Sequence, residues 1–243
     1  MKNLKSILDK PTGRRNAALV AGSLVALTVV GLSAGPAFAH GSSGDPKSRV
    51  LGCFEAGVTN YPFGESAYEG CNDAYDVSGE SPFANWQGIV VGDTRLGQVD
   101  AQYRTVVPDG QLCAAGNERY AGLDVPSDDW PTTDLPSGED FTLNFKNTVA
   151  HNPYTFNYYI TKDGYDPKQP LTWDDLEATP FLVADNVESL EQGTPNMHTE
   201  LPVLLPEKSG SHVVYTVWQG NVKPDGTTQS NEAFFACSNV NFG

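Results

Sequence analysis

The sequence of 243 residues predicts an all-β fold, an antiparallel β-sandwich. Apolar and polar residues alternate strictly over residues 141–146, which is the pattern of a half-buried strand. Further short β-rich runs occupy residues 156–161, 212–218 and 234–242, and turn-forming clusters separate them. Because no internal repeat and no low-complexity linker follows residue 40, these runs are expected to form one domain.

The N-terminal segment has the three parts of a secretory signal peptide. Five basic residues precede an apolar run over residues 17–32, and Ala37-Phe38-Ala39 forms a small-x-small cleavage site. The run is short for a membrane span and has no basic stop-transfer flank. The Arg14-Arg15 pair leaves the twin-arginine route open, but its neighbours match that signal poorly, which favours general export. We therefore expect residues 1–39 to be cleaved and residues 40–243 to form a secreted, extracellular domain.

The charge of the chain excludes several classes of partner. The full sequence has a formal net charge of −15, and cleavage after Ala39 leaves 204 residues with ten basic and 29 acidic side chains, a charge of −19. Such a surface repels the phosphates of nucleic acids, anionic membranes and anionic polysaccharides. Neutral or cationic partners are therefore favoured, and neither nucleic acid nor a membrane is expected among them.

Four cysteines lie in the part of the chain that follows the leader. An even number of cysteines in an exported chain indicates two disulfides, and four cysteines allow three pairings. We favour Cys53–Cys71, a local link in the first loop, together with Cys113–Cys237, which would tie the middle of the chain to its last strand. A zinc site is the alternative, but the chain has no Cys-x-x-Cys pair.

Two segments differ from this pattern of strands and turns. Residues 172–177 predict a short helix, because Thr172 can cap it and acidic residues would fill its first turn. The stretch from Glu55 to Gln102 is long and rich in Gly, Ser, Asn and aromatic residues. Since loops of that length are often functional, we expect it to form a structured surface loop region.

The histidines are the most informative residues for chemistry. Cleavage after Ala39 would make His40 the first residue, where its α-amine and its ring Nδ1 can chelate one metal ion; a disordered terminus without function is the alternative. His151 follows the alternating strand at an edge where loops gather, whereas His198 reads as an exposed loop residue and His212 as a core or edge residue. Three nitrogen donors with open coordination positions suit Cu(II).

Seven motifs, taken in order, give residues 40–243 a resemblance to a known family. They are the His-Gly and Pro-x-Ser-Arg of residues 40–49 and the segments at residues 107–113, 150–151, 159–166, 169–173, 209–218 and 234–238. Together they resemble the bacterial lytic polysaccharide monooxygenases of auxiliary-activity family ten, whose domain is also called the chitin-binding type-4 domain. The resemblance implies an immunoglobulin-like or fibronectin III-like β-sandwich with a long, partly helical loop region.

The resemblance also implies one copper ion and a set of residues around it. His40 would bind the metal through its amine and Nδ1, and His151 through its other ring nitrogen. An aromatic ring blocks one axial position in the family; the match places Phe234 there, with Phe235 as the alternative because an insertion near residues 222–229 loosens the alignment. Two further residues would lie near the copper ligands: the small residue Ala150 beside His151, and the acid Glu80, whose alternative interpretation is an ordinary acid in a polar loop.

The function that the resemblance implies is oxidative cleavage of glycosidic bonds in crystalline chitin, ahead of cellulose, with oxidation at C1. An external electron donor and O2 or H2O2 would take part, and the protein is expected to be a monomer. Exposed rings of the loop region would bind sugar faces, although Trp86 is expected to pack inside. The alternatives are a non-catalytic chitin-binding protein or adhesin and a copper carrier. The aromatic residues of the loop region are Tyr61, Phe63, Tyr68, Tyr75, Phe83 and Trp86.

Overall fold

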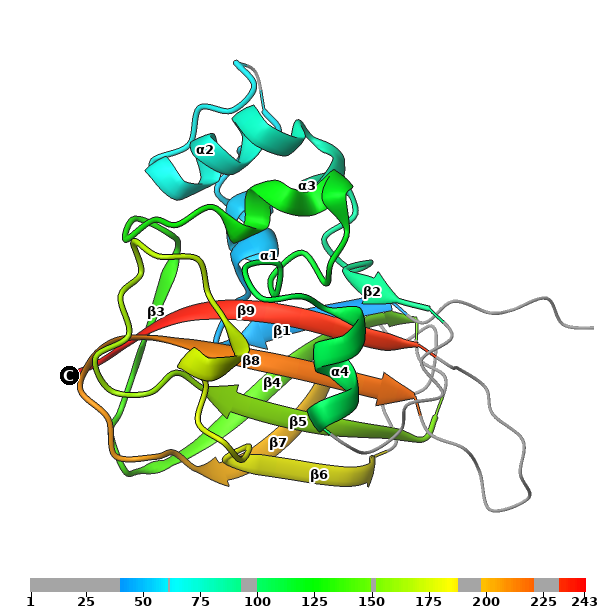
Figure 1. The fold of residues 1–243 in the computed structure, drawn as a ribbon, viewed down its shortest axis with the longest axis vertical. Coiled ribbons are helices and arrows are strands. Elements are labelled where there is room, and N and C mark those ends of the chain that lie inside the picture. Colours follow the sequence, from blue (N-terminus) through cyan, green and yellow to red (C-terminus); the bar gives the residue numbers. More distant parts are fainter. Residues whose placement is uncertain (1–39, 61, 93–99, 150–151, 188–197, 221–231) are drawn as a thin grey trace, which may run out of the picture. The chain divides into compact units, whose positions relative to one another are not determined.

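The computed structural model describes residues 40–60, 62–92, 100–149, 152–187, 198–220 and 232–243, all of which belong to the unit formed by residues 35–243 (Figure 1). Within these residues the strands form two sheets, which confirms the predicted β-sandwich. No helix among them is long and apolar enough to cross a membrane.

The first sheet has the described strand order β1-β4-β7, and both pairings are antiparallel. Its strands are β1 (His40–Asp45), β4 (Asp140–Val149) and β7 (His198–Leu204). The alternation at residues 141–146 lies in β4, where Leu143 and Phe145 are buried. β1 was not predicted, because its Gly and Ser residues carry no strand pattern. It is held instead by pairing with β4 and by a bond of 2.8 Å between the hydroxyls of Ser42 and Ser48.

The second sheet has the described order β2-β9-β8-β5-β6, and β3 also pairs with β9. All pairings are antiparallel except that of β3 with β9, which is parallel. Its strands are β2 (Val90–Val91), β3 (Thr132–Leu135), β5 (Tyr154–Ile160), β6 (Leu182–Val187), β8 (Gly210–Gly220) and β9 (Ala233–Phe242). The three β-rich runs correspond to β5, β8 and β9, so their assignment as strands is confirmed.

A helical layer packs against the second sheet, with α4 over its outer face and the other helices along β9 (Figure 1). It contains α1 (Arg49–Glu55), α2 (Glu69–Ser78), α3 (Ser81–Ala84), α4 (Asp100–Val106) and η1 (Glu118–Asp124). The region from Glu55 to Gln102 is therefore partly helical where it is described, as expected. The predicted helix at residues 172–177 is a single 3-10 turn, η2 (Trp173–Asp175), capped by Thr172.

β8 and β9 are buried on both faces, which gives the fold two cores. On β8, Val214 and Trp218 face the other sheet, and Val213, Tyr215 and Val217 face the helical layer. Such strands read as continuous apolar runs rather than as alternating ones. Two disulfides strengthen the helical layer: Cys53–Cys71 joins α1 to α2, and Cys113–Cys237 joins the layer to β9. These are the pairings that the sequence favoured.

A buried charged cluster links the helical layer to β9. The guanidinium of Arg49 donates to Asn239 Oδ1 at 2.7 Å and to the Leu123 carbonyl at 2.9 Å, and it lies 4.6 Å from the ring centre of Trp130. Nearby, the carboxyl of Asp124 accepts hydrogen bonds from two backbone N–H groups, at 2.7 and 3.2 Å. Burial raises the pKa of Asp124 to about 7, although those bonds and Arg49 lower it.

The raised pKa of Asp124 predicts a specific pH dependence of stability. A carboxyl whose pKa is higher in the folded than in the unfolded protein stabilises the fold while it is protonated, so this contribution is lost as the pH rises from about 4 to about 7. Asp124→Asn is expected to flatten the fall in the free energy of unfolding over that interval, as measured by urea unfolding at a series of pH values. An unchanged slope would show that Asp124 titrates normally.

Candidate functional site

His40 is the first residue of β1, and neighbouring segments hold its backbone and that of Gly41. Its Cα pairs with that of Val149, the last residue of β4. The next residue, Gly41, donates its N–H to the Gln87 carbonyl at 2.8 Å, which ties the loop after α3 to β1. A Cβ on Gly41 would lie 2.6 Å from Phe145, so only glycine fits there. Packing therefore requires the glycine of the His-Gly pair, whereas the histidine is the residue with the predicted metal-binding role.

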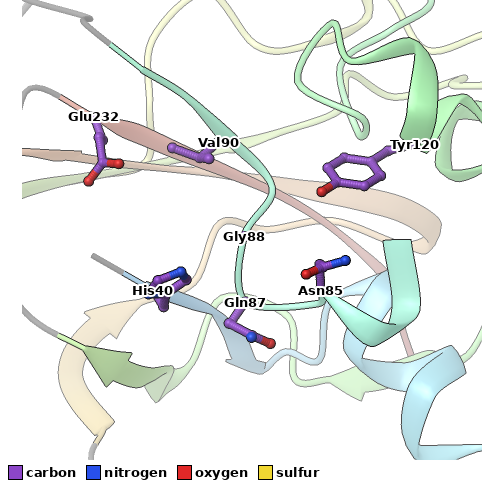
Figure 2. Close-up of a pocket in the computed structure, with 7 residues that line it drawn as sticks. All are labelled: His40, Asn85, Gln87, Gly88, Val90, Tyr120 and Glu232. Atoms are coloured by element: carbon purple, nitrogen blue, oxygen red, sulfur yellow. The ribbon is translucent and has the colours of Figure 1, made fainter. Parts of the chain in front are cut away.

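A surface pocket of about 220 Å³ opens beside His40 (Figure 2). The loop after α3, strand β2, the 3-10 helix η1 and the start of β9 contribute its walls. Figure 2 shows the imidazole of His40 and the carboxyl of Glu232 at one end of the pocket, and Asn85 and Tyr120 at the other. Its lining residues are His40, Asn85, Gln87, Gly88, Val90, Tyr120 and Glu232.

Glu232 is the acidic residue of this pocket, and sequence reasoning missed it. The residue is 8% exposed and immediately precedes β9. Its carbonyl accepts a hydrogen bond of 2.9 Å from the Gly220 N–H, which closes the ladder between β8 and β9. The signal that could have found it is its place two residues before Phe234, because alternate residues of a strand point to the same side. Glu80, by contrast, is exposed at the cap of α3 and does not line the pocket.

Phe234 and Phe235 face opposite sides of the second sheet. Phe234 belongs to the core between the sheets, and its ring centre lies 4.9 Å from that of Trp218. A Cβ on Gly41 would lie 3.3 Å from the same Trp218 ring. Trp218 therefore packs against Phe234 and also lies next to the backbone of Gly41, the residue after His40. Phe235 packs instead in the helical layer against Tyr103.

The other residues of the predicted site are distributed as follows. Ala150 and His151 lie outside the described residues. His198 is in β7, where its Nε2 is 3.0 Å from Glu200, so it is a strand residue rather than a loop residue. His212 is buried, with Nδ1 3.0 Å from the Thr161 hydroxyl, in agreement with a core role. Among the described residues, His40 is therefore the predicted metal ligand that lines the pocket.

The donor chemistry of the pocket fits a metal bound through nitrogen. His40 supplies an imidazole, and thiolate ligands are excluded because all four cysteines form disulfides. Among the described residues, no group of three His, Cys, Asp or Glu could hold a metal ion. A metal at this place would consequently depend on His40 and on residues beyond the described set, and His151 is the predicted one.

A stack of aromatic rings rises from the core to the surface of the loop region. Phe83 is fully buried, Tyr75 stacks on it with ring centres 6.4 Å apart, and Phe63 stacks on Tyr75 at 6.4 Å and is 57% exposed. Trp86 is partly buried against the helical core, as expected, and Lys146 Nζ lies 5.2 Å from its ring centre. Tyr68 is also partly buried, and Tyr61 lies outside the described residues.

Fold and site together define a β-sandwich protein with a histidine-containing surface pocket at the start of its first strand. The model of the family described as lytic polysaccharide mono-oxygenase, cellulose-degrading, matches residues 40–240, and the chain belongs to this family of polysaccharide-cleaving monooxygenases.

Two relatives with similar sequences illustrate the family. Chitin-binding protein CbpD of Pseudomonas aeruginosa is 38% identical over 222 residues, which are 90% of this chain and 52% of the relative. A lytic cellulose monooxygenase of Streptomyces ambofaciens is 36% identical over 231 residues, 93% of this chain and 60% of the relative. The chain thus spans between half and two thirds of the length of these relatives.

Solved structures agree with this assignment. The cellulose-active enzyme CelS2, in complex with copper, has a TM-score of 0.69 at 31% identity and covers 84% of this chain and 99% of its own. A lytic polysaccharide monooxygenase important for utilisation of chitin in Cellvibrio japonicus has a TM-score of 0.68 at 30% identity, with coverage of 84% and 100%. The family therefore contains a copper-bound member with the fold of this chain.

Proposed function

We propose that residues 1–39 are a cleaved signal peptide and that residues 40–243 form a secreted, copper-dependent monooxygenase that oxidises crystalline chitin at C1. The observation that carries the proposal is the position of His40, which lines a pocket at the start of β1 and is the first residue that the family model matches. Cleavage after Ala39 would give this residue a second donor, its α-amine.

His151 is proposed as the second histidine ligand. It is two residues beyond Val149, whose Cα pairs with that of His40. Consecutive Cα atoms are 3.8 Å apart, so covalent geometry keeps the Cα of His151 within about 7.6 Å of that of Val149. Paired Cα atoms in antiparallel strands are about 5 Å apart, so both rings can reach one ion. The copper-bound relative CelS2 supports the choice of metal.

The bound copper would supply redox chemistry with O2 or H2O2 and an external electron donor. The residues of the chain would perform the other tasks. Glu232, nearly buried, places a carboxyl in the pocket that could exchange a proton with H2O2 there, so we assign the role proposed for Glu80 to Glu232 instead. Phe234 rather than Phe235 is proposed to lie beside a copper ion that His40 would hold, because Phe234 shares the inter-sheet core with Phe145 and Trp218, the rings next to Gly41.

The substrate is proposed to lie across the pocket and the exposed ring of Phe63. Stacking on Tyr75 and Phe83 holds that ring in place, and a rigid exposed ring suits the apolar face of a sugar. The formal net charge of −19 that cleavage after Ala39 would leave is compatible with neutral or partly cationic glycans. The name of the relative CbpD supports chitin, and that of the relative from Streptomyces ambofaciens supports cellulose as the second choice.

One experiment tests the activity and separates it from simple binding. The protein beginning at His40 is incubated with copper and a reductant on β-chitin and on cellulose, and the soluble products are identified by mass spectrometry. Oligosaccharides ending in aldonic acids, released from chitin, are expected. Adsorption to chitin without oxidised products would instead favour the non-catalytic binding function that the name of CbpD suggests.

Removing the second ligand is expected to abolish tight copper binding. His151→Ala should lower copper affinity by more than the roughly 10- to 100-fold that loss of an outer-shell partner costs, because a ligand atom is lost. Isothermal titration calorimetry measures the affinity. His198→Ala is the matched control, because that histidine lies in β7, bonded to Glu200, and does not line the pocket. Equal affinities of the two variants would contradict the assignment.

A further inference from the structure

A buried amide lies directly behind Glu232. Gln219 is the penultimate residue of β8 and is 1% exposed. Its Nε2 donates to the Gly220 carbonyl at 2.8 Å and to the Glu232 carbonyl at 3.3 Å. Both hydrogens of this amide are therefore bound to the two carbonyls that flank residues 221–231.

A helix on the outer face holds this amide in turn. Tyr103 of α4 is 1% exposed, and its hydroxyl donates to Gln219 Oε1 at 3.1 Å. Its ring also packs edge-on against Phe235 of β9, with ring centres 5.7 Å apart. α4 consequently contacts the second sheet at the place where β8 ends and β9 begins (Figure 1).

These contacts fix the position of Glu232. The Glu232 peptide is held by the Gly220 N–H at 2.9 Å and by the Gln219 amide at 3.3 Å, and its side chain reaches the pocket beside His40 (Figure 2). A buried side-chain network of this kind fixes a geometry more firmly than single bonds would. Displacement of a reacting group by about 1 Å can cost about 100-fold in rate.

We propose that Tyr103 and Gln219 are positioning residues that act through Glu232, setting its carboxyl relative to His40. This inference rests on the proposed function, since it assigns to Glu232 a role in the oxidation. Hydrogen bonds of the Tyr103 hydroxyl and the Gln219 amide would thus connect α4 to the wall of the pocket.

The test is a double-mutant cycle on the copper-loaded protein. Tyr103→Phe deletes the hydroxyl that donates to Gln219 and keeps the ring, and Gln219→Met replaces the amide by an apolar chain of similar length. Each is combined with Glu232→Gln, and interaction energies are taken from the rates of release of oxidised products. Cu(II) electron paramagnetic resonance provides a readout independent of activity. Tyr215→Phe is the matched control, because Tyr215 stacks on the same Phe235 at 6.0 Å and its buried hydroxyl has no hydrogen-bond partner among the described residues.

Tyr103→Phe is expected to lower the rate about 10- to 100-fold with Glu232 present and less than about twofold with Glu232→Gln. Its Cu(II) spectrum should shift in the same sense as that of Glu232→Gln, and Tyr215→Phe should leave rate and spectrum unchanged. Additive losses of rate, or a Tyr103→Phe spectrum identical to that of the wild type, would overturn the positioning role. A wild-type protein without copper binding or oxidised products would overturn the proposed function itself. If Gln219→Met does not fold, Tyr103→Phe carries the test alone.

Discussion

A protein that keeps Ala39 ahead of His40 is expected to lose tight copper binding and the release of oxidised oligosaccharides. One extra residue converts the α-amine of His40 into an amide, which leaves only the ring as a donor from this residue and breaks the proposed chelate. The expected loss of copper affinity exceeds the roughly 10- to 100-fold cost of losing an outer-shell partner. Calorimetric titration with copper and product analysis on chitin measure the two losses, and mass spectrometry verifies each N-terminus.

The extended protein also provides its own control for folding. β1 begins at His40 and is held through Gly41 and its pairing with β4, so the copper-free midpoint of thermal unfolding should not change. An extended protein that bound copper and cleaved chitin as well as the cleaved one would show that the amine is not a ligand. The site would then have to be built from side chains alone.

Among the substitutions proposed for this protein, Arg49→Met is expected to lower the free energy of unfolding most. Arg49 is 4% exposed, and its guanidinium is bonded to Asn239 and to the Leu123 carbonyl and packed on the Trp130 ring. Its loss leaves buried acceptors without donors and removes a cation near Asp124. Removing one partner of a buried charged network costs about 3–5 kcal/mol. Urea unfolding with both disulfides intact measures the change.

Arg104→Met is the matched control for this prediction. Arg104 also pairs with an acid, Asp174 at 2.9 Å, and also lies over a tryptophan, 5.7 Å from the ring centre of Trp173. Its side chain is 46% exposed, however, so solvent screens its interactions. A much smaller loss is therefore expected for Arg104→Met. Equal losses in the two variants would mean that burial does not decide the contribution of Arg49.

The sequence predicted the strands whose side chains carry the pattern. β4 alternates, and β5, β8 and β9 are rich in β-branched and aromatic residues, so their periodicity and composition indicate strands directly. β1 and β7 escaped prediction for physical reasons. β1 is built from Gly and Ser and depends on its pairing with β4, and β7 contains Pro202, which weakens the strand signal.

The candidate site shows the same division between local and long-range information. His40 could be predicted because the leader and the His-Gly pair are both local patterns. Glu232 could not, because it is 192 positions away from His40 and meets it through the order of strands in two sheets. The contact of Tyr103 with Gln219, 116 residues apart, is likewise a product of tertiary packing.

The double burial of β9 has a consequence for how the protein loses activity. Its side chains pack in both cores, and Cys237 ties it to the helical layer, so its amide protons should be among the slowest to exchange with solvent. Phe234 lies at the start of this strand, and Glu232 immediately precedes it. Local fluctuations that open exposed loops would leave them in place, and inactivation by heat should therefore coincide with global unfolding.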